Sequence, residues 1–271
     1  MRILRCLTEN GLTVHVTEGE RGSYHMLHGN PDEGFKTTQS HAAVKQILAP
    51  VAPTMIWCIG LNYRRHAEET GAKIPEQPVV FAKGPNTVQH PGGAIEIPTH
   101  LASEQVDYEC ELAVVIGRTC KNVRPEHALD YVLGYTCAND VSARDWQIKR
   151  GGSQWSRGKT FDTFMPLGPV LVTPEHIPDP NVLHIQTRLN GEVVQDSNTS
   201  DMIFNVREII SFLSGSTTLL PGTVILTGTP EGVGMARTPP RWLVPGDEVT
   251  VEIEHIGALT NHVVLEPAQA E

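Results

Sequence analysis

The sequence has little positive charge, and its apolar residues never form a long run. Lysine and arginine total 21 against 31 aspartate and glutamate residues, which gives a formal net charge of −10. Proteins that bind nucleic acid usually carry a basic surface, so we expect no nucleic-acid partner. No stretch approaches the about 18 apolar residues of a transmembrane helix, and "MRILRCLTEN" does not resemble a secretory signal. These absences predict a cytoplasmic protein without a membrane partner.

Cysteine is also scarce. The five cysteines are odd in number, and no pair has the C-x-x-C spacing of a zinc or redox motif. We expect reduced, buried thiols, because Cys58, Cys110 and Cys137 lie in apolar, strand-like runs. A G-x-S-x-G motif is missing, and Gly158-Lys159-Thr160 lacks the earlier glycine of a phosphate loop. The sequence therefore gives no support to a covalent acyl-enzyme or a nucleotide phosphate loop.

Strand-like segments are the most frequent pattern that is present. In residues 1–52, "RILRCLT" and "LTVHVTE" predict two strands, and "SHAAVKQILAP" predicts a helix from Ser40 to a stop at Pro50. We interpret these residues as a small N-terminal α+β domain. Residues 53–271 form the predicted main domain, with strands in "YECELAVVIG", "VLGYTCAND" and "TVILTGTP" and a clear helix in "MIFNVREIISFLS". The whole chain is predicted to be mostly β with a few covering helices.

Acidic residues gather in the stretch "VDYECELAVV". Asp107, Glu109 and Glu111 occupy alternate positions, which places them on one face of a strand, and Asp140 ends another predicted strand. Carboxylate oxygens without a nearby histidine or cysteine suit a hard cation such as Mg²⁺, Mn²⁺ or Ca²⁺. The alternative is a solvated acidic strand face, and spacing alone leaves both interpretations open.

Three further features indicate catalysis. His66 and Glu69 stand at i and i+3 of a short helix, where a carboxylate can orient an imidazole that activates water. Lys159 lies among small and apolar residues, where it could pair with an anionic substrate or a developing oxyanion. The segment "VILTGTPEGVG" is a strand that runs into a glycine-rich turn, which could hold a carboxylate through backbone N–H groups and the hydroxyls of Thr227 and Thr229. The alternatives are a surface helix, a surface lysine and a plain turn.

Taken in order, several segments resemble the fumarylacetoacetate hydrolase superfamily. They are "CIGLNYRRHAEE", "DYECELAVVIG", "GYTCANDVSARDWQ", "GKTFDTFMPLGP", "LNGEVVQDSNTSDMIF" and "LTGTPEGVG". The resemblance extends from about residue 57 to about residue 257. It implies a mixed β-sheet fold, a sandwich rolled toward a barrel, preceded by a small N-terminal domain and assembled as a homodimer.

The resemblance also implies roles for nine residues. Glu109, Glu111 and Asp140 match the ligands of Mg²⁺ or Mn²⁺, with Ca²⁺ as a further possibility, and Asp107 is left solvated beside them. His66 and Glu69 match a dyad on a lid segment, and Lys159 matches the active-site lysine. The matches to substrate-binding positions are Arg144, Gln147 and Thr229.

The implied activity is metal-dependent chemistry on a small-molecule 2-oxo acid through its enolate. Hydrolysis of a carbon–carbon bond in an acylpyruvate or fumarylpyruvate-like substrate is the first expectation, with His66 activating the water. Decarboxylation of an oxaloacetate-type acid and keto–enol tautomerisation of a 2-hydroxydienedioate are alternatives on the same site. A non-catalytic metal-binding protein is a third possibility.

Overall fold

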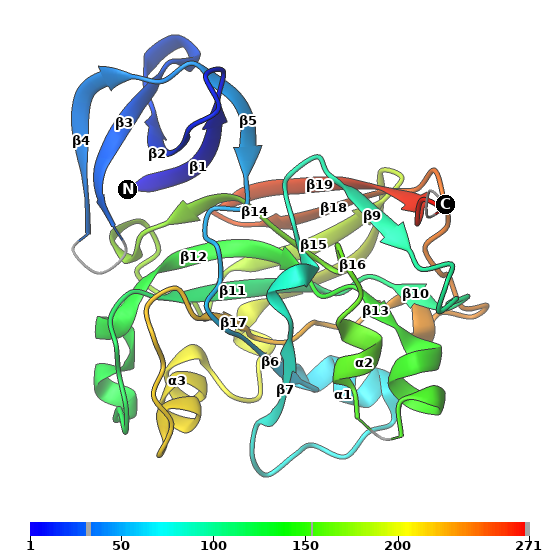
Figure 1. The fold of residues 1–271 in the computed structure, drawn as a ribbon. Coiled ribbons are helices and arrows are strands. Elements are labelled where there is room, and N and C mark those ends of the chain that lie inside the picture. The colour runs from blue at the N-terminus through cyan, green and yellow to red at the C-terminus, as the bar shows by residue number, and fades with distance from the viewer. Residues whose placement is uncertain (31–33, 153, 269–271) are drawn as a thin grey trace.

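A computed structural model describes residues 1–30, 34–152 and 154–268, and most of its regular structure is β-strand (Figure 1). The N-terminal residues form a strand-rich unit above the rest of the chain. Strand β1 joins this unit to the main sheet by pairing with β14. The elements of the unit are β1 (Arg2–Thr8), β2 (Thr13–Glu18), η1 (Glu20–Gly22), β3 (Tyr24–Asn30), β4 (Gly34–His41) and β5 (Val44–Leu48).

The prediction of a helix that begins at Ser40 is wrong. Residues 40–48 instead complete β4 and form β5, which pairs antiparallel with β1 and places Cys6 opposite Ile47. Pairing with an open strand edge outweighs a local helical pattern, because it satisfies backbone hydrogen bonds and buries apolar side chains together. Among the described residues of 1–52, the only helical element is the 3-10 turn η1. The boundary near residue 52 stays a prediction.

The main part of the chain contains two mixed sheets, which confirms the predicted mostly-β class. The large sheet has the order β4-β3-β2-β1-β14-β12-β11-β17-β6-β7, and the second has the order β16-β15-β18-β19-β9. Strands of the large sheet not yet bounded are β6 (Ile56–Gly60), β7 (Val79–Lys83), β8 (Val88–Gln89), β11 (Cys110–Ile116), β12 (Val132–Asn139), β14 (Met165–Val172) and β17 (Val224–Leu226). The second sheet consists of β9 (Ala94–Ile97), β15 (His184–Leu189), β16 (Glu192–Asn198), β18 (Glu248–Ile253) and β19 (Gly257–Leu265). A separate pair is formed by β10 (Val106–Asp107) and β13 (Ser142–Ala143).

Helices are short and lie around the sheets (Figure 1). The predicted helix in "MIFNVREIISFLS" is α3 (Val206–Ser214), which starts at Val206 because Asn205 and Glu208 form a capping box there. None of the helices in the described part of the chain combines the length and hydropathy needed to cross a bilayer. The other helical elements are α1 (Arg64–Thr70), α2 (Ser156–Lys159), η2 (Pro85–Thr87), η3 (Pro125–Tyr131), the π-helix η4 (Asp145–Arg150), η5 (Pro174–His176), η6 (Thr199–Asp201) and η7 (Gly234–Ala236).

Strand β11 is the centre of the molecule and is buried along its whole length. Its neighbours β12 and β17 cover both edges, and alternate side chains enter two apolar clusters on opposite faces of the sheet. Cys58, Cys110 and Cys137 are buried and unpaired, as predicted. A strand fixed on both edges and both faces is a rigid support for side chains at its beginning.

Candidate active site

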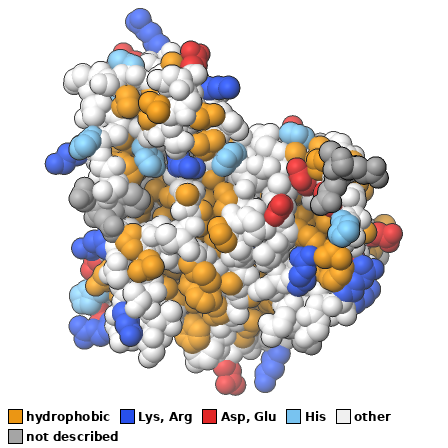
Figure 2. Space-filling model, in the orientation of Figure 1, with side chains coloured by type: hydrophobic (Ala, Val, Ile, Leu, Met, Phe, Trp, Pro, Cys, Tyr) orange, Lys and Arg blue, Asp and Glu red, His pale blue; other side chains and the backbone are white. Residues whose placement is uncertain are grey.

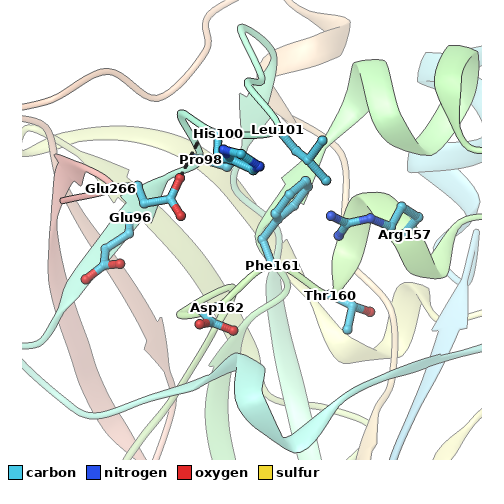
Figure 3. Close-up of a pocket in the computed structure, with 9 residues that line it drawn as sticks. All are labelled: Glu96, Pro98, His100, Leu101, Arg157, Thr160, Phe161, Asp162 and Glu266. Carbon is cyan, nitrogen blue, oxygen red and sulfur yellow. Dashed lines mark hydrogen bonds between the residues drawn. The ribbon is translucent and has the colours of Figure 1, made fainter. Parts of the chain in front are cut away.

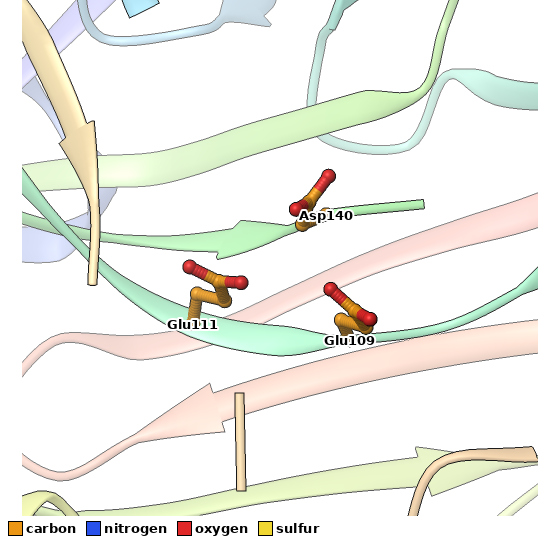
Figure 4. Close-up of side chains that lie close together, drawn as sticks. All are labelled: Glu109, Glu111 and Asp140. Atoms are coloured by element: carbon orange, nitrogen blue, oxygen red, sulfur yellow. The ribbon is translucent and has the colours of Figure 1, made fainter. Parts of the chain in front are cut away.

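The start of β11 and the end of β12 bring the three predicted metal ligands together. Cys110 pairs with Asn139 in this antiparallel ladder, and the N–H of Asp140 donates to the carbonyl of Glu109 at 2.8 Å. Figure 4 shows the three carboxylates close together beside these two strands. One oxygen from each of Glu109, Glu111 and Asp140 lies within 4.8 Å of the others, and all three residues are buried. Residues about 30 positions apart thus converge because of strand register.

This donor set fits a hard divalent cation. Glu111 accepts the N–H of Gly228 at 2.7 Å, and it forms no ion pair with any residue that the structure describes. Burial, together with the charges of Asp140 and Glu109, raises the pKa of Glu111 well above its usual range. A cation held by the three carboxylates would remove this repulsion, and three oxygen donors are the set that Mg²⁺ or Mn²⁺ accepts.

Two buried lysines already neutralise part of the acidic cluster. Lys159 Nζ lies 2.6 Å from Glu109 Oε2 and 2.7 Å from Asp140 Oδ2, so this predicted residue is in the site. Burial alone would raise the pKa of Glu109, but Lys159 and Arg144 outweigh it and lower that pKa to about 2. Lys83, at the end of β7, donates to Asp140 Oδ1 and was not predicted. Its only signal in the sequence is a lysine that ends the apolar run "VVFAK".

Asp107 was predicted to be solvated, and this is wrong. Its exposed fraction is 0%. Arg144 Nε donates to Asp107 Oδ2 at 2.9 Å, and the N–H groups of Gly234 and Met235 donate to its two oxygens at 2.7 Å and 3.0 Å. A buried carboxylate needs such partners, and Arg144 comes from a segment 37 residues away that spacing within one strand cannot reveal.

The predicted dyad lies on α1. His66 is 8% exposed, and its Nδ1 lies 3.2 Å from Glu69 Oε2. The other oxygen of Glu69 accepts the N–H of Gly232 at 2.9 Å. Gly71, with a φ of 64°, ends the helix in the left-handed conformation that glycine adopts readily. The carboxylate is therefore fixed from two sides and holds the imidazole in one orientation.

The glycine-rich turn after β17 does bind carboxylates, but they belong to the protein itself. Backbone N–H groups of Gly228, Gly232 and Gly234 donate to Glu111, Glu69 and Asp107. The hydroxyl of Thr227 donates to the carbonyl of Leu112 at 2.9 Å and is thus structural. Thr229 Oγ1 accepts from Gln195, a buried side chain that the sequence did not indicate. This turn connects the strand that carries Glu111, the dyad and Asp107.

A cavity of about 170 Å³ lies beside the acidic cluster. Apolar side chains form much of its remaining wall, including Ile59, Phe81, Trp155 and Met235. The volume is below the roughly 300–1,000 Å³ of most small-molecule sites, which favours a small substrate. Seven of the nine predicted residues line the cavity, namely His66, Glu109, Glu111, Arg144, Gln147, Lys159 and Thr229. Of the other two predicted residues, Glu69 bonds to His66 and Asp140 bonds to Lys159.

A second cavity, of about 260 Å³, contains none of the nine predicted residues in its described lining. Figure 3 shows Phe161 at its centre, with Arg157 on one side and Glu266 on the other. The Arg157 guanidinium stacks on the Phe161 ring at 4.2 Å, and Glu266 accepts the N–H of Thr99 at 2.7 Å. Arg157 and Glu266 lie on opposite sides of this cavity and are each engaged in a separate contact, so the smaller cavity is the candidate active site.

A family model and several known proteins are similar to this chain. The family model of the fumarylacetoacetate hydrolase C-terminal domain matches residues 55–264. The mitochondrial oxaloacetate tautomerase fahd2 of Xenopus laevis is 50% identical over 219 residues, which cover 80% of this chain and 68% of the relative. The structure of a 5-carboxymethyl-2-hydroxymuconate delta-isomerase from Mycobacterium smegmatis superposes with a TM-score of 0.85 at 37% identity and covers 98% of this chain and 100% of its own. A fumarylpyruvate hydrolase from Pseudomonas aeruginosa, solved with Mn²⁺ and pyruvate, superposes with a TM-score of 0.71 at 32% identity. The match covers 82% of this chain and 93% of that protein's own chain.

Proposed function

The chain belongs to the fumarylacetoacetate hydrolase family, and on this premise we propose that it is a metal-dependent tautomerase of a short 2-oxo acid of the oxaloacetate type. The observation that carries the proposal is the buried carboxylate cluster at one wall of a small cavity that His66 also lines. From the sequence alone, hydrolysis is the first expectation among the three reactions. Tautomerisation now comes first because the 50% identical relative is named for it and the cavity is small.

Glu109, Glu111 and Asp140 would hold Mg²⁺ or Mn²⁺, and the ion would supply the Lewis acidity that stabilises negative charge on a substrate oxygen. Lys159 adds a positive charge beside it. Burial lowers the pKa of Lys159, but Asp140 and Glu109 outweigh this effect and raise it, so the side chain stays an ammonium and does not serve as a base. Arg144 and Gln147 would bind a carboxylate of the substrate.

The proton transfer falls to His66. Glu69 holds Nδ1, which leaves Nε2 to accept a proton from the substrate carbon next to the ketone. The electron pair of that C–H bond forms the carbon–carbon double bond of the enolate. Delivery of the proton to the enolate oxygen gives the enol and regenerates the imidazole. The apolar walls formed by Ile59, Phe81 and Trp155 keep competing water away.

Hydrolysis of an acylpyruvate is the second candidate, and the dyad geometry favours it specifically. A histidine oriented by a carboxylate also suits deprotonation of a water, which would then attack the distal carbonyl.

One experiment separates tautomerisation, decarboxylation and hydrolysis. Protein supplied with Mn²⁺ is given oxaloacetate or acetylpyruvate, and enol absorbance and products are followed by spectrophotometry and NMR. We expect catalysed keto–enol exchange of oxaloacetate, whereas pyruvate from oxaloacetate indicates decarboxylation, and pyruvate with acetate from acetylpyruvate indicates hydrolysis.

The proposed assembly is a homodimer. Figure 2 shows hydrophobic side chains gathered on one face of the molecule below the N-terminal unit, and Val80 of β7 is 36% exposed. Light scattering after size-exclusion chromatography tests this proposal, since one chain has a mass of 29.7 kDa and the dimer has twice that mass. The predicted cytoplasmic location also stays a prediction.

A further inference from the structure

Asp107 holds one edge of the Arg144 guanidinium. Arg144 Nε donates to Asp107 Oδ2 at 2.9 Å, and Nη2 lies 2.9 Å from the same oxygen. Three backbone N–H groups fix the aspartate in turn: those of Tyr108 and Gly234 donate to Oδ1, and that of Met235 donates to Oδ2. Gly234 leaves no room for a side chain here, because a Cβ would lie 2.6 Å from Asp107 Oδ1. Asp107 is thus anchored by three backbone groups as well as by the arginine that it binds.

The other corner of Arg144 faces the candidate active site. Nη1 lies 2.6 Å from Glu109 Oε1 and donates to Gln147 Oε1 at 3.0 Å. Glu109, Arg144 and Gln147 all line the small cavity, whereas Asp107 does not. Nε and Nη2 of the guanidinium therefore bind the buried Asp107, while Nη1 reaches the proposed metal ligand Glu109 and the cavity.

We propose that Asp107 is a positioning residue, which keeps Arg144 turned toward the substrate and prevents it from pairing with both oxygens of Glu109. The inference rests on the proposed function, in which Glu109 binds the metal and Arg144 binds a substrate carboxylate. An arginine and a carboxylate prefer a two-bond, side-by-side pair. Without the anchor, Glu109 is the nearest carboxylate that Arg144 can join in this way. That pair would compete with a cation for Glu109 and would withdraw Arg144 from the cavity.

A double-mutant cycle with Mn²⁺ as the probe tests this role without turnover. Calorimetry gives the Mn²⁺ affinity of the wild type, Asp107→Asn, Arg144→Ala and the double variant. Asp107→Asn should weaken Mn²⁺ binding about tenfold or more, in the range typical of groups that orient metal ligands. In the Arg144→Ala background, the same substitution should have no further effect. Equal weakening in both backgrounds would overturn the inference, because Asp107 would then act independently of Arg144.

Steady-state kinetics provide a second readout, in which Asp107→Asn should raise KM for the 2-oxo acid more than it lowers kcat. The matched control is Asp247→Asn. Asp247 is a buried aspartate outside the cavity that also pairs with an arginine, Arg241, at 2.7 Å and accepts the N–H of Val244. This control should lose thermal stability but keep the wild-type KM and Mn²⁺ affinity. A rise in KM for Asp247→Asn equal to that for Asp107→Asn would mean that general destabilisation explains both.

If Asp107→Asn does not fold, Arg144→Lys keeps the inference testable. A lysine has one point charge, so it cannot hold Asp107 and reach the cavity at the same time. We expect KM for the 2-oxo acid to rise. An unchanged KM would contradict the claim that Arg144 must bind Asp107 and face the cavity at the same time. The wild type separates this inference from the proposed function: tight Mn²⁺ binding without turnover of any 2-oxo acid would refute the proposed reaction, while the calorimetric cycle would still decide the role of Asp107.

Discussion

Lys83 and Asp140 form an ion pair in which both side chains are completely buried. Lys83 Nζ donates to Asp140 Oδ1 and, at 3.1 Å, to the carbonyl of Val141, while Lys159 binds the other oxygen of Asp140. Two lysines from distant segments thus hold one proposed metal ligand. The two lysines therefore neutralise part of the acidic cluster. Glu111, which has no such partner among the described residues, still faces the negative charges of Asp140 and Glu109.

Replacing Lys83 by methionine should destabilise the protein strongly. Removing one partner of a buried ion pair typically costs about 3–5 kcal/mol, because the other charge stays buried with less compensation. Lys159 still pairs with Asp140, so we expect a loss near the lower limit, about 3 kcal/mol. Urea unfolding in the presence of a chelator measures it. The exposed Lys121→Met variant is the control, and equal stability of the two variants would contradict the pairing.

Glu111→Gln should stabilise the metal-free protein, and more so at higher pH. The folded protein binds a proton at Glu111 more readily than the unfolded chain, whose carboxyl has the ordinary pKa of 4.5. Stability linked to this group is thus complete below pH 4.5 and is lost as pH rises above it. Glutamine does not ionise and still accepts the N–H of Gly228. Thermal unfolding with EDTA should show a larger gain at pH 8 than at pH 5; a variant less stable than wild type at both values would refute the prediction.

The same variant should lose the benefit of metal. Mn²⁺ that binds only the folded state raises the unfolding temperature. We expect this increase in the wild type and its near absence in Glu111→Gln, which has lost one anionic ligand. An equal Mn²⁺-dependent increase in both proteins would show that Glu111 is not a ligand.

His66→Gln should lower kcat for keto–enol exchange by about 100-fold or more, because glutamine cannot accept the proton. Mn²⁺ binding should not change, since His66 is outside the carboxylate cluster. The control is His100→Gln, which alters the second cavity and should keep wild-type activity. Full tautomerase activity of His66→Gln, together with lost acetylpyruvate hydrolysis, would assign the dyad to the hydrolytic reaction instead.

Trp155→Ala should widen the choice of substrates. The indole lies over Gly60, where a Cβ would approach Trp155 Cζ3 to 2.2 Å, and it packs edge-on against Phe81 at 5.7 Å. Removing it enlarges the cavity beside Lys159. We expect the ratio of kcat/KM for phenylpyruvate to that for oxaloacetate to rise about tenfold. Trp155→Phe should give a smaller change. A constant ratio across the three proteins would mean that this wall does not limit substrate size.

The sequence predicts the parts of the fold that depend on local patterns. Apolar, strand-like runs identify β11 and β12, and the asparagine–glycine pair at 190–191, a typical hairpin signal, forms the turn between β15 and β16 with positive φ at both residues. The chemistry of Glu109, Glu111 and Asp140 likewise follows from residue type. Their close approach was inferred from a resemblance, and the ladder register now explains it in physical terms.

The remaining features depend on partners that are distant in the sequence. Residues 44–48 have a pattern that permits a helix, and only the open edge of β1 makes them a strand. Asp107 looks like a solvated acid until Arg144 and the loop at Gly234 are packed against it. Lys83 could have extended its ammonium into water at the end of β7, and burial beside Asp140 decides otherwise. Long-range packing, rather than local propensity, therefore determines where these charged side chains lie and which partners they have.

The Mn²⁺ dependence of oxaloacetate tautomerisation by the metal-stripped protein shows whether a carboxylate-bound metal drives the reaction. Enol absorbance is followed for the wild type and Glu109→Gln, with and without added Mn²⁺. We predict that Mn²⁺ restores keto–enol exchange to the wild type well above the protein-free rate, and that Glu109→Gln stays inactive. Equal exchange rates in the stripped and Mn²⁺-loaded wild type, or wild-type activity in Glu109→Gln, would contradict a carboxylate-bound metal at the centre of the reaction.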